Sequence, residues 1–391
     1  MIKPRVAADI AQSLVDDARQ SGCLPRWPYA NQQTNVMVGD PSDQIIASTY
    51  ALGAREFDSA AALQAMVKGA SERCHTVNGD YTEREALDDY LRVGYVPFER
   101  TVDDMIHSQL KRDEPWGTAS TTLEYALADF SISRLAAALG QPATANAFAA
   151  RSGNWRTLVN PATGEMQPRQ GTGLFAPDFT TASKEGWVEG NSAQYNWFAP
   201  HDPAGLFDSM GGREQATARL DQFFTELNAG QGSPFAYFGN EPTMFTPWLY
   251  DWLGLPSRAQ KVVRDVLVDH YAPTPTGLPG NDDGGATSAW YVLSALGLYP
   301  TVPGTDLLAV GSPLFPETRV RLAGGTLTLD APLADRARPY VTDMTVDGHP
   351  HDAPWLRFAD LIDGGRIEWG LGDAPTGWGT NPADAPPSYS P

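Results

Sequence analysis

The periodicity of an amphipathic helix extends over the first 300 residues, and this feature sets the strongest limit on the fold. Apolar residues recur there at three- and four-residue intervals, strand alternation is almost absent, and short Gly- or Pro-containing breaks interrupt the pattern. A mainly helical protein is therefore expected. The segments predicted to be helical are 4–22, 43–53, 58–74, 82–94, 118–140, 142–159, 212–228, 256–271 and 285–297.

Two of these segments carry additional signals. Thr82-x-x-Glu85 has the spacing of a capping box and predicts a helix start, while Gly94 stands where the residue after that helix should be. Segment 118–140 has apolar residues spaced for one buried helix face, namely Leu123, Leu127, Phe130 and Leu135.

The number and similar length of the helices favour helical hairpins arranged in a ring, an α/α toroid. Short and long connections alternate along the chain, and a toroid gathers the long loops at one mouth. A simple helical bundle is the alternative. Bundles seldom need connections as long as 160–190 or 229–246, however, so the toroid is preferred.

The pattern changes after Pro303. Residues 318–322 and 325–331 alternate with period two around a Gly-Gly turn, which predicts a β-hairpin, and 341–346 and 366–369 add short strands. We therefore expect a helical domain over 1–303 and a β-rich region over 304–372. Residues 373–391 are rich in Pro, Ala and Ser and are expected to be disordered.

Composition narrows the range of partners. The 391 residues carry a formal net charge of -19, a field that repels nucleic acid, attracts divalent cations and does not repel neutral sugars. No apolar run approaches the ~20 residues needed to span a bilayer. The two cysteines, Cys23 and Cys74, allow either one disulfide or two free thiols.

The chain begins within a helical pattern. Val6, Ile10 and Leu14 lie on one stripe of the first predicted helix, and no hydrophobic signal-peptide region precedes them. We therefore expect the sequence to be truncated at its N-terminus. The pattern does not determine an oligomeric state.

Polar residues gather with Gly, Pro and aromatic residues in three places. We name them the Glu189 segment (187–202), the Glu241 segment (238–242) and the Asp283 segment (277–285, followed by Ser288-Ala-Trp-Tyr). In each, a carboxylate lies at a predicted helix entrance, where backbone N–H groups favour its ionised form. Capping needs only one short acidic residue, so these clusters exceed what capping requires.

The chemistry of the three segments suits glycoside hydrolysis. That reaction needs a protonated carboxyl to assist the leaving oxygen and a carboxylate to activate water. Glu189 adjoins Trp187 and Tyr195, apolar surroundings that raise a carboxyl pKa and suit the acid. Asp282 and Asp283, in a polar loop, suit the base. With Glu241 they also offer oxygen ligands for a hard cation, although the spacing is not that of an EF-hand.

Structural alternatives stand beside these functional interpretations. Glu189 alone is often a helix cap or salt-bridge partner, and the Asp282–Asp283 pair is often a turn. The His201–Asp202 pair is either a substrate contact or a buried hydrogen-bonded pair.

Substrate contacts are nevertheless predicted within the clusters. Arg26-Trp27 is more often an Arg–aromatic stack than a sugar site, and is not among them. The predicted substrate-binding residues are Trp187, Asn191, Tyr195, His201, Asp202, Asn240 and Glu241.

Taken together, the chain resembles glycoside hydrolase family 92, a family of calcium-dependent α-mannosidases. The resemblance covers roughly residues 10–320 and rests on several short words in the family's order. These are Leu24-Pro-Arg-Trp, Met37-Val-Gly-Asp, Glu189-Gly-Asn, Trp197-Phe-Ala-Pro-His-Asp202, Gly239-Asn-Glu-Pro242, Leu278-Pro-Gly-Asn-Asp-Asp283, Ser288-Ala-Trp-Tyr and Gly311-Ser-Pro-Leu-Phe315.

The resemblance implies an (α/α)6 catalytic barrel, incomplete at its N-terminal end, and an inverting exo-α-mannosidase acting on mannose-containing glycans. It places the acid at Glu189 and the base at Asp283, with Asp282 beside it, and it places Glu241 in the substrate site. It also implies a Ca2+ ion, for which Glu241 and Asp283 are the predicted ligands. Full-length relatives suggest a secreted or periplasmic protein.

Departures from the family pattern leave alternatives open. The N-terminal β-sandwich and first barrel helices are absent, and Thr243-Met244-Phe245 stands where relatives often carry Ser-His-His. Ala193 stands where an aromatic residue is common, and Asn240-Glu241 differs from the His-Glu linked to α-1,2 specificity, so the linkage stays open. The alternatives are an inactive or sugar-binding fragment, or another toroid enzyme acting on sugars.

Overall fold

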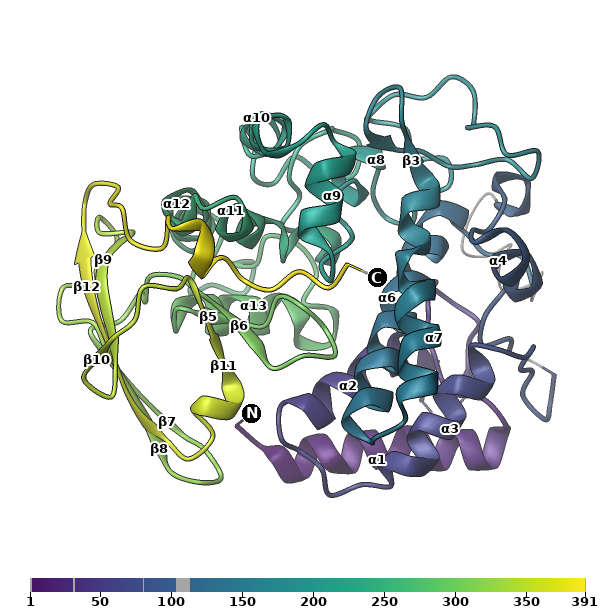
Figure 1. The fold of residues 1–391 in the computed structure, drawn as a ribbon, viewed down its shortest axis with the longest axis horizontal. Coiled ribbons are helices and arrows are strands. Elements are labelled where there is room, and N and C mark those ends of the chain that lie inside the picture. The colour runs from purple at the N-terminus through teal and green to yellow at the C-terminus, as the bar shows by residue number, and fades with distance from the viewer. Residues whose placement is uncertain (1, 31, 80, 103–112, 391) are drawn as a thin grey trace. The chain divides into compact units, whose positions relative to one another are not determined.

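The computed structural model describes residues 2–30, 32–79, 81–102 and 113–390, and its chain forms two compact units (Figure 1). The N-terminal unit is built mainly from Pro4–Asp202, joined by Pro303–Thr305 and Tyr389 onward. The C-terminal unit comprises mainly Pro203–Val302 and Asp306–Ser388. The division at Asp202 falls inside the stretch 1–303 that we expected to form a single domain, so the two units are described separately.

Helices dominate the N-terminal unit, as the periodicity predicted. Six helices of seven or more residues coincide with six predicted segments. For most of them, the observed ends lie within five residues of the predicted ends. They are α1 (Pro4–Ser21), α2 (Pro41–Ala51), α3 (Ser59–Gly69), α4 (Leu87–Val93), α6 (Thr118–Ala138) and α7 (Pro142–Ser152), the last continued by a 3-10 turn over Gly153–Leu158.

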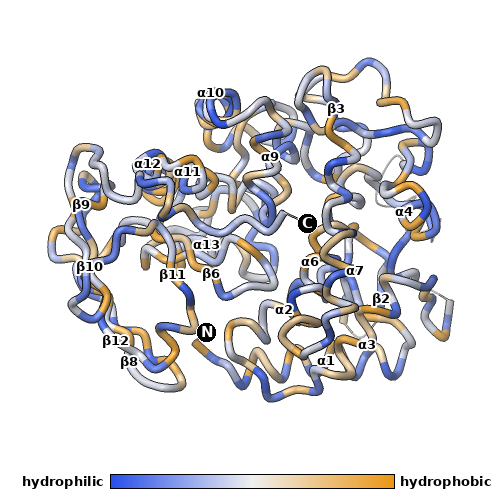
Figure 2. Tube along the Cα trace, viewed as in Figure 1, coloured by the Kyte–Doolittle hydropathy of each residue, from blue (hydrophilic) through white to orange (hydrophobic). Residues whose placement is uncertain are grey.

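Of the predicted stripe on α1, only Leu14 packs against the core. Ala8, Ala11 and Val15 form its buried face, whereas Val6 and Ile10 are exposed. Small side chains allow α1 to approach α2 and α3 closely, and helix packing therefore selected that face. Hydrophilic and hydrophobic residues alternate along α1 in Figure 2, in agreement with its two-sided character.

The predicted capping box is wrong, although the predicted helix end is confirmed. The helix α4 begins at Leu87, because Thr82 and Glu85 are engaged elsewhere. The Thr82 N–H donates to Asn35 Oδ1 at 3.3 Å, and the Asn35 amide donates to Glu85 at 3.1 Å. Gly94 follows α4 with φ 81° and donates its N–H to a carbonyl in that helix.

The helix α6 is buried nearly all round, not on one face as its apolar stripe suggested. Its four stripe residues are buried, but so are most of its Ser and Thr residues. The hydroxyls of Thr122, Ser131 and Ser133 donate to carbonyls of the same helix, as Thr122 Oγ1 does to Thr118 O at 2.8 Å. This removes the cost of burying them and lets α6 pack against α2, α3 and α7 at once.

A disulfide joins Cys23 and Cys74, which settles the choice that the sequence left open. The two residues lie 51 positions apart, after α1 and after α3 respectively, and pack with Tyr81. The bond closes a long loop and thereby lowers the entropy of the unfolded chain.

The C-terminal unit begins with short helices and ends with sheets. Three of its helices, α10 (Arg213–Phe223), α12 (Pro256–Asp269) and α13 (Ala286–Ala295), confirm predicted segments. Two short helices, α9 (Pro203–Ser209) and α11 (Leu249–Trp252), were not predicted because they are too short to show a period.

The β-rich region is confirmed. The predicted hairpin pairs β7 (Glu317–Arg321) with β8 (Thr326–Asp330), and β8 runs parallel to β12 (Gly365–Gly372). The strands β9 (Tyr340–Val346) and β10 (His349–Pro350) complete a five-stranded sheet in the order β10-β9-β12-β8-β7. A smaller sheet joins β11 (Trp355–Arg357), β6 (Leu307–Val310) and β5 (Leu298–Tyr299).

The tail is ordered over the residues that the structure describes, contrary to the expected disorder of 373–391. Three indole N–H groups anchor it within the C-terminal unit. Trp378 donates to His351 O at 3.0 Å, while Trp252 and Trp355 donate to tail carbonyls at 3.1 Å each. Composition predicted disorder because it contains no information on the hydrogen bonds that side chains elsewhere in the unit form with the backbone of the tail.

Glu124, in α6, gives a prediction for pH dependence. Burial raises its pKa from 4.5 to about 8, so the folded protein holds this proton more tightly than the unfolded chain. Its contribution to stability is therefore complete near pH 4.5 and is lost as pH rises through about 8. We measure the free energy of unfolding in urea at pH 6 and at pH 9. We expect the decrease between these two pH values to be smaller in E124Q than in wild type by at least ~1 kcal/mol. The exposed E226Q should match wild type, and parallel profiles for all three proteins would contradict the assignment.

Candidate active site

The N-terminal unit holds the Glu189 segment, and the C-terminal unit holds the Glu241 and Asp283 segments. In the N-terminal unit, the start of α6 anchors the backbone just before Glu189. The Gly186 carbonyl accepts the N–H groups of Ala119 and Ser120 at 2.9 and 3.2 Å, and Ser120 Oγ accepts the Val188 N–H at 3.0 Å. These anchors fix the position from which the Glu189 side chain projects.

Glu189 is half-buried and adopts a left-handed backbone conformation, with φ 51°. Such a conformation is costly for a residue other than glycine, and it is concentrated at functional sites. The rings of Trp187 and Tyr195 stack on each other with centroids 5.3 Å apart, and the Tyr195 hydroxyl donates to Val188 O at 2.8 Å. That these rings border the Glu189 carboxyl and raise its pKa stays a prediction.

Three predicted substrate contacts in this segment are buried: Trp187, Asn191 and Tyr195. Asn191 caps the short helix α8 (Ser192–Tyr195), since its side chain accepts the Gln194 N–H at 3.2 Å. The structure thus gives these residues a supporting role around Glu189. Their direct contact with a sugar stays a prediction.

The His201–Asp202 pair is also buried, and its contacts favour the structural interpretation. His201 Nε2 lies 3.1 Å from Ser152 O, and its ring stacks on Phe130 with centroids 5.1 Å apart. Burial lowers the pKa of His201 to about 4, which keeps the ring neutral near pH 7. Asp202 pairs with Arg156 and accepts the Ser390 hydroxyl at 2.5 Å.

In the C-terminal unit, the Glu241 and Asp283 segments pack backbone to backbone. A methyl group added at Gly280 would lie 2.3 Å from Gly239 O, closer than any side chain tolerates. Asn228 ties the segments together, because its amide donates to Pro279 O at 2.9 Å and its oxygen accepts the Gly239 N–H at 3.0 Å. The sequence did not single out Asn228, whose role depends on the tertiary contact.

The two adjacent aspartates have different surroundings. Asp282 Oδ1 accepts the N–H and hydroxyl of Ser288 at 2.9 and 2.7 Å, so Asp282 caps the start of α13. Asp283 is exposed and has φ 45°, and its carboxylate has no hydrogen bond or ion pair to any residue in the described ranges. Asp282 therefore fits the structural alternative, and Asp283 is the carboxylate left available for chemistry.

Glu241 opens a 3-10 turn over Glu241–Thr243 and is half-buried, next to the buried Asn240. Burial, and then the nearby Glu241 carboxylate, raise the pKa of Tyr299. The Tyr299 ring stacks on Trp248 with centroids 5.8 Å apart. The residues after this turn, Thr243-Met244-Phe245, are buried, so this departure from the family pattern lies in the core.

The carboxylates of the C-terminal unit do not form a complete metal cage. Within the described ranges, the only three metal-ligating side chains whose ligand atoms converge are Cys23, Cys74 and Glu83, and the disulfide occupies both sulfurs. Glu241 and Asp283 nevertheless lie on segments that Gly239 and Gly280 lock together. Both offer carboxylate oxygens, so their chemistry fits a hard cation completed by other oxygen ligands.

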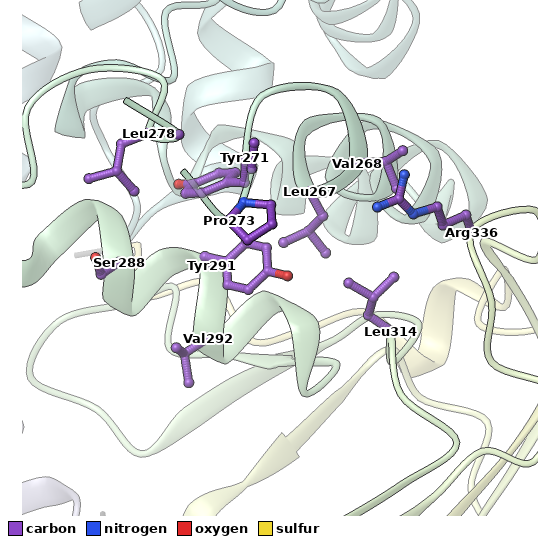
Figure 3. A pocket seen from close by; sticks show the side chains of 12 residues that line it. Leu267, Val268, Tyr271, Pro273, Leu278, Ser288, Tyr291, Val292, Leu314 and Arg336 are labelled. Carbon is purple, nitrogen blue, oxygen red and sulfur yellow. The ribbon is translucent and has the colours of Figure 1, made fainter. Parts of the chain in front are cut away.

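A pocket of about 480 Å3 adjoins the Asp283 segment within the C-terminal unit (Figure 3). Tyr271 and Tyr291 lie in its centre on either side of Pro273, and Leu278 and Ser288 line one end. Ser288 is the residue that bonds to Asp282, so this wall supports the loop that carries Asp283. The sequence did not predict this pocket, because its lining combines α12, α13 and the loop between them with Leu314 and Arg336, which come later in the chain.

Comparison with known proteins identifies the family. The family model described as the glycosyl hydrolase family 92 catalytic domain matches residues 1–373. Two solved structures from Bacteroides thetaiotaomicron are similar: a family GH92 α-mannosidase (TM-score 0.88, 30% identity, 99% of this chain and 50% of that chain) and a GH92 inverting mannosidase (TM-score 0.89, 30% identity, 100% and 53%).

A curated relative from Arthroderma benhamiae, described as an uncharacterized secreted glycosidase, is 26% identical over 404 residues, which cover 96% of this chain and 50% of the relative. The chain thus spans about half the length of the relatives it matches. No helix in the described ranges is long and apolar enough to cross a membrane. Fold, sequence profile and relatives agree: the chain belongs to glycosyl hydrolase family 92.

Proposed function

We propose that this chain is the part of an exo-α-mannosidase that carries the catalytic carboxylates, and that it hydrolyses terminal non-reducing α-mannosides with inversion. The observation that carries the proposal is the placement of Glu189 and Asp283. Each lies directly before a glycine, Gly190 or Gly284, and has a left-handed backbone conformation, with φ 51° and 45°. The family's mannosidase members support this assignment, and with it we propose that 1–303 belongs to an (α/α)6 barrel that is incomplete at its N-terminal end.

In the proposed mechanism, Glu189 donates a proton to the leaving oxygen. This role requires a protonated Glu189, a form that apolar neighbours such as Trp187 and Tyr195 would favour. The Asp283 carboxylate accepts a proton from water, which attacks the opposite face of the sugar.

We further propose that Ca2+ binds at Glu241 and Asp283. A bound calcium ion would supply electrostatic binding of sugar hydroxyls at this site. The role of the protein is to hold the two carboxylates, and the tight packing of Gly239 on Gly280 fixes their backbones relative to each other. Asp282 acts as a positioning residue by capping α13.

The second candidate is a sugar-binding chain without turnover, favoured by one observation: the chain spans about half of its relatives' length. Secretion is also proposed, because the curated relative is described as secreted and the Cys23–Cys74 disulfide persists in oxidising compartments.

The test is a time course of sugar release, followed by NMR, from an α-mannoside at saturating calcium. We expect β-mannose as the first product, before mutarotation, with activity abolished by EDTA and restored by calcium. α-Mannose as the first product would contradict inversion, and full activity after exhaustive EDTA treatment would contradict the calcium site. Binding of mannosides without any release would establish the second candidate instead.

A further inference from the structure

Two aromatic side chains stand exposed together in the N-terminal unit. Trp27 precedes the strand β1 (Pro28–Tyr29), which pairs with β2 (Gln32–Gln33), and the exposed fractions of Trp27 and Tyr29 are 46% and 72%. Their ring centroids lie 6.5 Å apart with planes 11° from parallel. Residues two apart in a strand share a face at a spacing of ~6.6 Å, so the extended backbone accounts for this geometry. We call this surface the Trp27–Tyr29 platform.

The platform stands on a rigid base. Arg26 is buried, and its guanidinium donates to Gly39 O and Met37 O at 3.1 Å each and to Glu83 O at 2.7 Å. The sequence suggested that Arg26 stacks on its aromatic neighbour, but it lies over the Tyr81 ring instead, 5.4 Å from its centroid. Its neighbour Trp27 is therefore left facing outward.

The Trp27 backbone is held as well, because its carbonyl accepts the Thr34 hydroxyl at 2.7 Å. A surface fixed before binding loses little entropy when a ligand arrives. Arg26 thus serves as a positioning residue for the platform, through the backbone that it anchors.

The chemistry of the platform fits a neutral sugar. Aromatic faces pack against apolar surfaces, and the C–H face of a pyranose is such a surface. The indole N–H of Trp27 and the hydroxyl of Tyr29 make no hydrogen bond to any residue within the described ranges, so both can bond to sugar hydroxyls. The net charge of -19 disfavours anionic ligands.

We propose that the Trp27–Tyr29 platform binds the glycan chain, one sugar ring against each aromatic face. The inference rests on the proposed function for the identity of the sugar, mannose. It goes beyond that function, since the platform is a binding surface with no part in proton transfer. Loss of the platform is expected to weaken binding of long glycans while leaving the hydrolysis of small mannosides intact.

The experiment measures binding of a soluble α-mannan to the full chain by calorimetry, with E189Q in every protein so that the ligand is not consumed. We expect W27A/Y29A to bind at least roughly tenfold more weakly, as truncation of paired aromatic contacts usually does. The matched control is F315A, because Phe315 is an aromatic residue with 46% exposure in the C-terminal unit. It should bind like the parent, and a neutral α-glucan without mannose should bind weakly to all.

Several outcomes would overturn the proposal: unchanged mannan affinity in W27A/Y29A, equal losses in F315A, or no mannan binding by the parent. Loss of self-association without loss of mannan binding would likewise assign the surface to protein contact. Y29F and W27F keep an aromatic face and lose only the polar group, so they should bind mannan more tightly than W27A/Y29A, which guards against misfolding of the alanine variants.

A separate assay without E189Q distinguishes this proposal from the proposed function. On an aryl α-mannoside, W27A/Y29A should keep kcat/KM within about twofold of wild type. A chain that binds mannan through the platform yet releases no mannose would sustain this inference while refuting the hydrolase assignment. A chain that releases mannose but binds mannan without any contribution from the platform would refute this inference and support the hydrolase assignment.

Discussion

Replacing Glu189 by Gln should slow hydrolysis of an alkyl α-mannoside by about 10³-fold, yet slow a dinitrophenyl α-mannoside less than ~10-fold. The physical reason is that dinitrophenolate leaves without a proton, whereas an alkoxide requires one. Asp283→Asn should slow both substrates by about 10³-fold, because water must be activated whatever the leaving group is. The measurement is kcat/KM for both substrates at saturating calcium.

Asp178 offers a matched control for this prediction. It is an exposed aspartate with a left-handed backbone conformation, φ 55°, close to the 45° of Asp283. Asp178→Asn should leave both rates unchanged, which shows that a strained backbone alone does not confer a role. Equal slowing of the two substrates by Glu189→Gln would contradict its assignment as the acid, and undiminished rates in Asp283→Asn would remove it as the base.

Replacing Arg84 by Met should destabilise the chain by about 3–5 kcal/mol, the largest loss of stability that we expect from one substitution. Arg84 is completely buried and binds three buried aspartates: Asp40 at 2.7 Å, Asp43 at 2.8 Å and Asp129 at 2.9 Å. Without the guanidinium, Asp40 and Asp43 remain in the core with no opposite charge beside them, and Asp129 keeps only Arg151, which binds it at 2.6 Å. Burial and the neighbouring Asp40 already raise the pKa of Asp43 well above its usual value.

The measurement is the free energy of unfolding in urea, near pH 7. Arg92→Met is the control, because Arg92 is an exposed arginine that pairs with Asp89 and should change stability by less than ~0.5 kcal/mol. Lys at position 84 should recover only part of the loss, because an ammonium cannot reproduce the planar fork that reaches three carboxylates. An Arg84→Met protein within ~1 kcal/mol of wild type would show that the aspartates take up protons at little cost.

Periodicity alone located the long helices, since an apolar stripe must face a core wherever that core lies. It could not choose the face in every case. On α1 it favoured Val6 and Ile10, whereas packing selected Ala8 and Ala11, because close approach of helices depends on the neighbour. The capping box failed for the same reason: Glu85 bonds to Asn35, which is 50 residues away.

The sequence by itself proposed the candidate site residues, through short words that carry Glu189, Glu241 and Asp283 with their glycines. Such words can be read locally, because a carboxylate in a glycine-rich turn at a helix entrance is a property of a few consecutive residues. Only the tertiary structure separated Asp282, which caps α13, from the exposed Asp283. It alone left Trp27 exposed by drawing Arg26 into the core, because burial and bonding partners depend on residues distant in the chain.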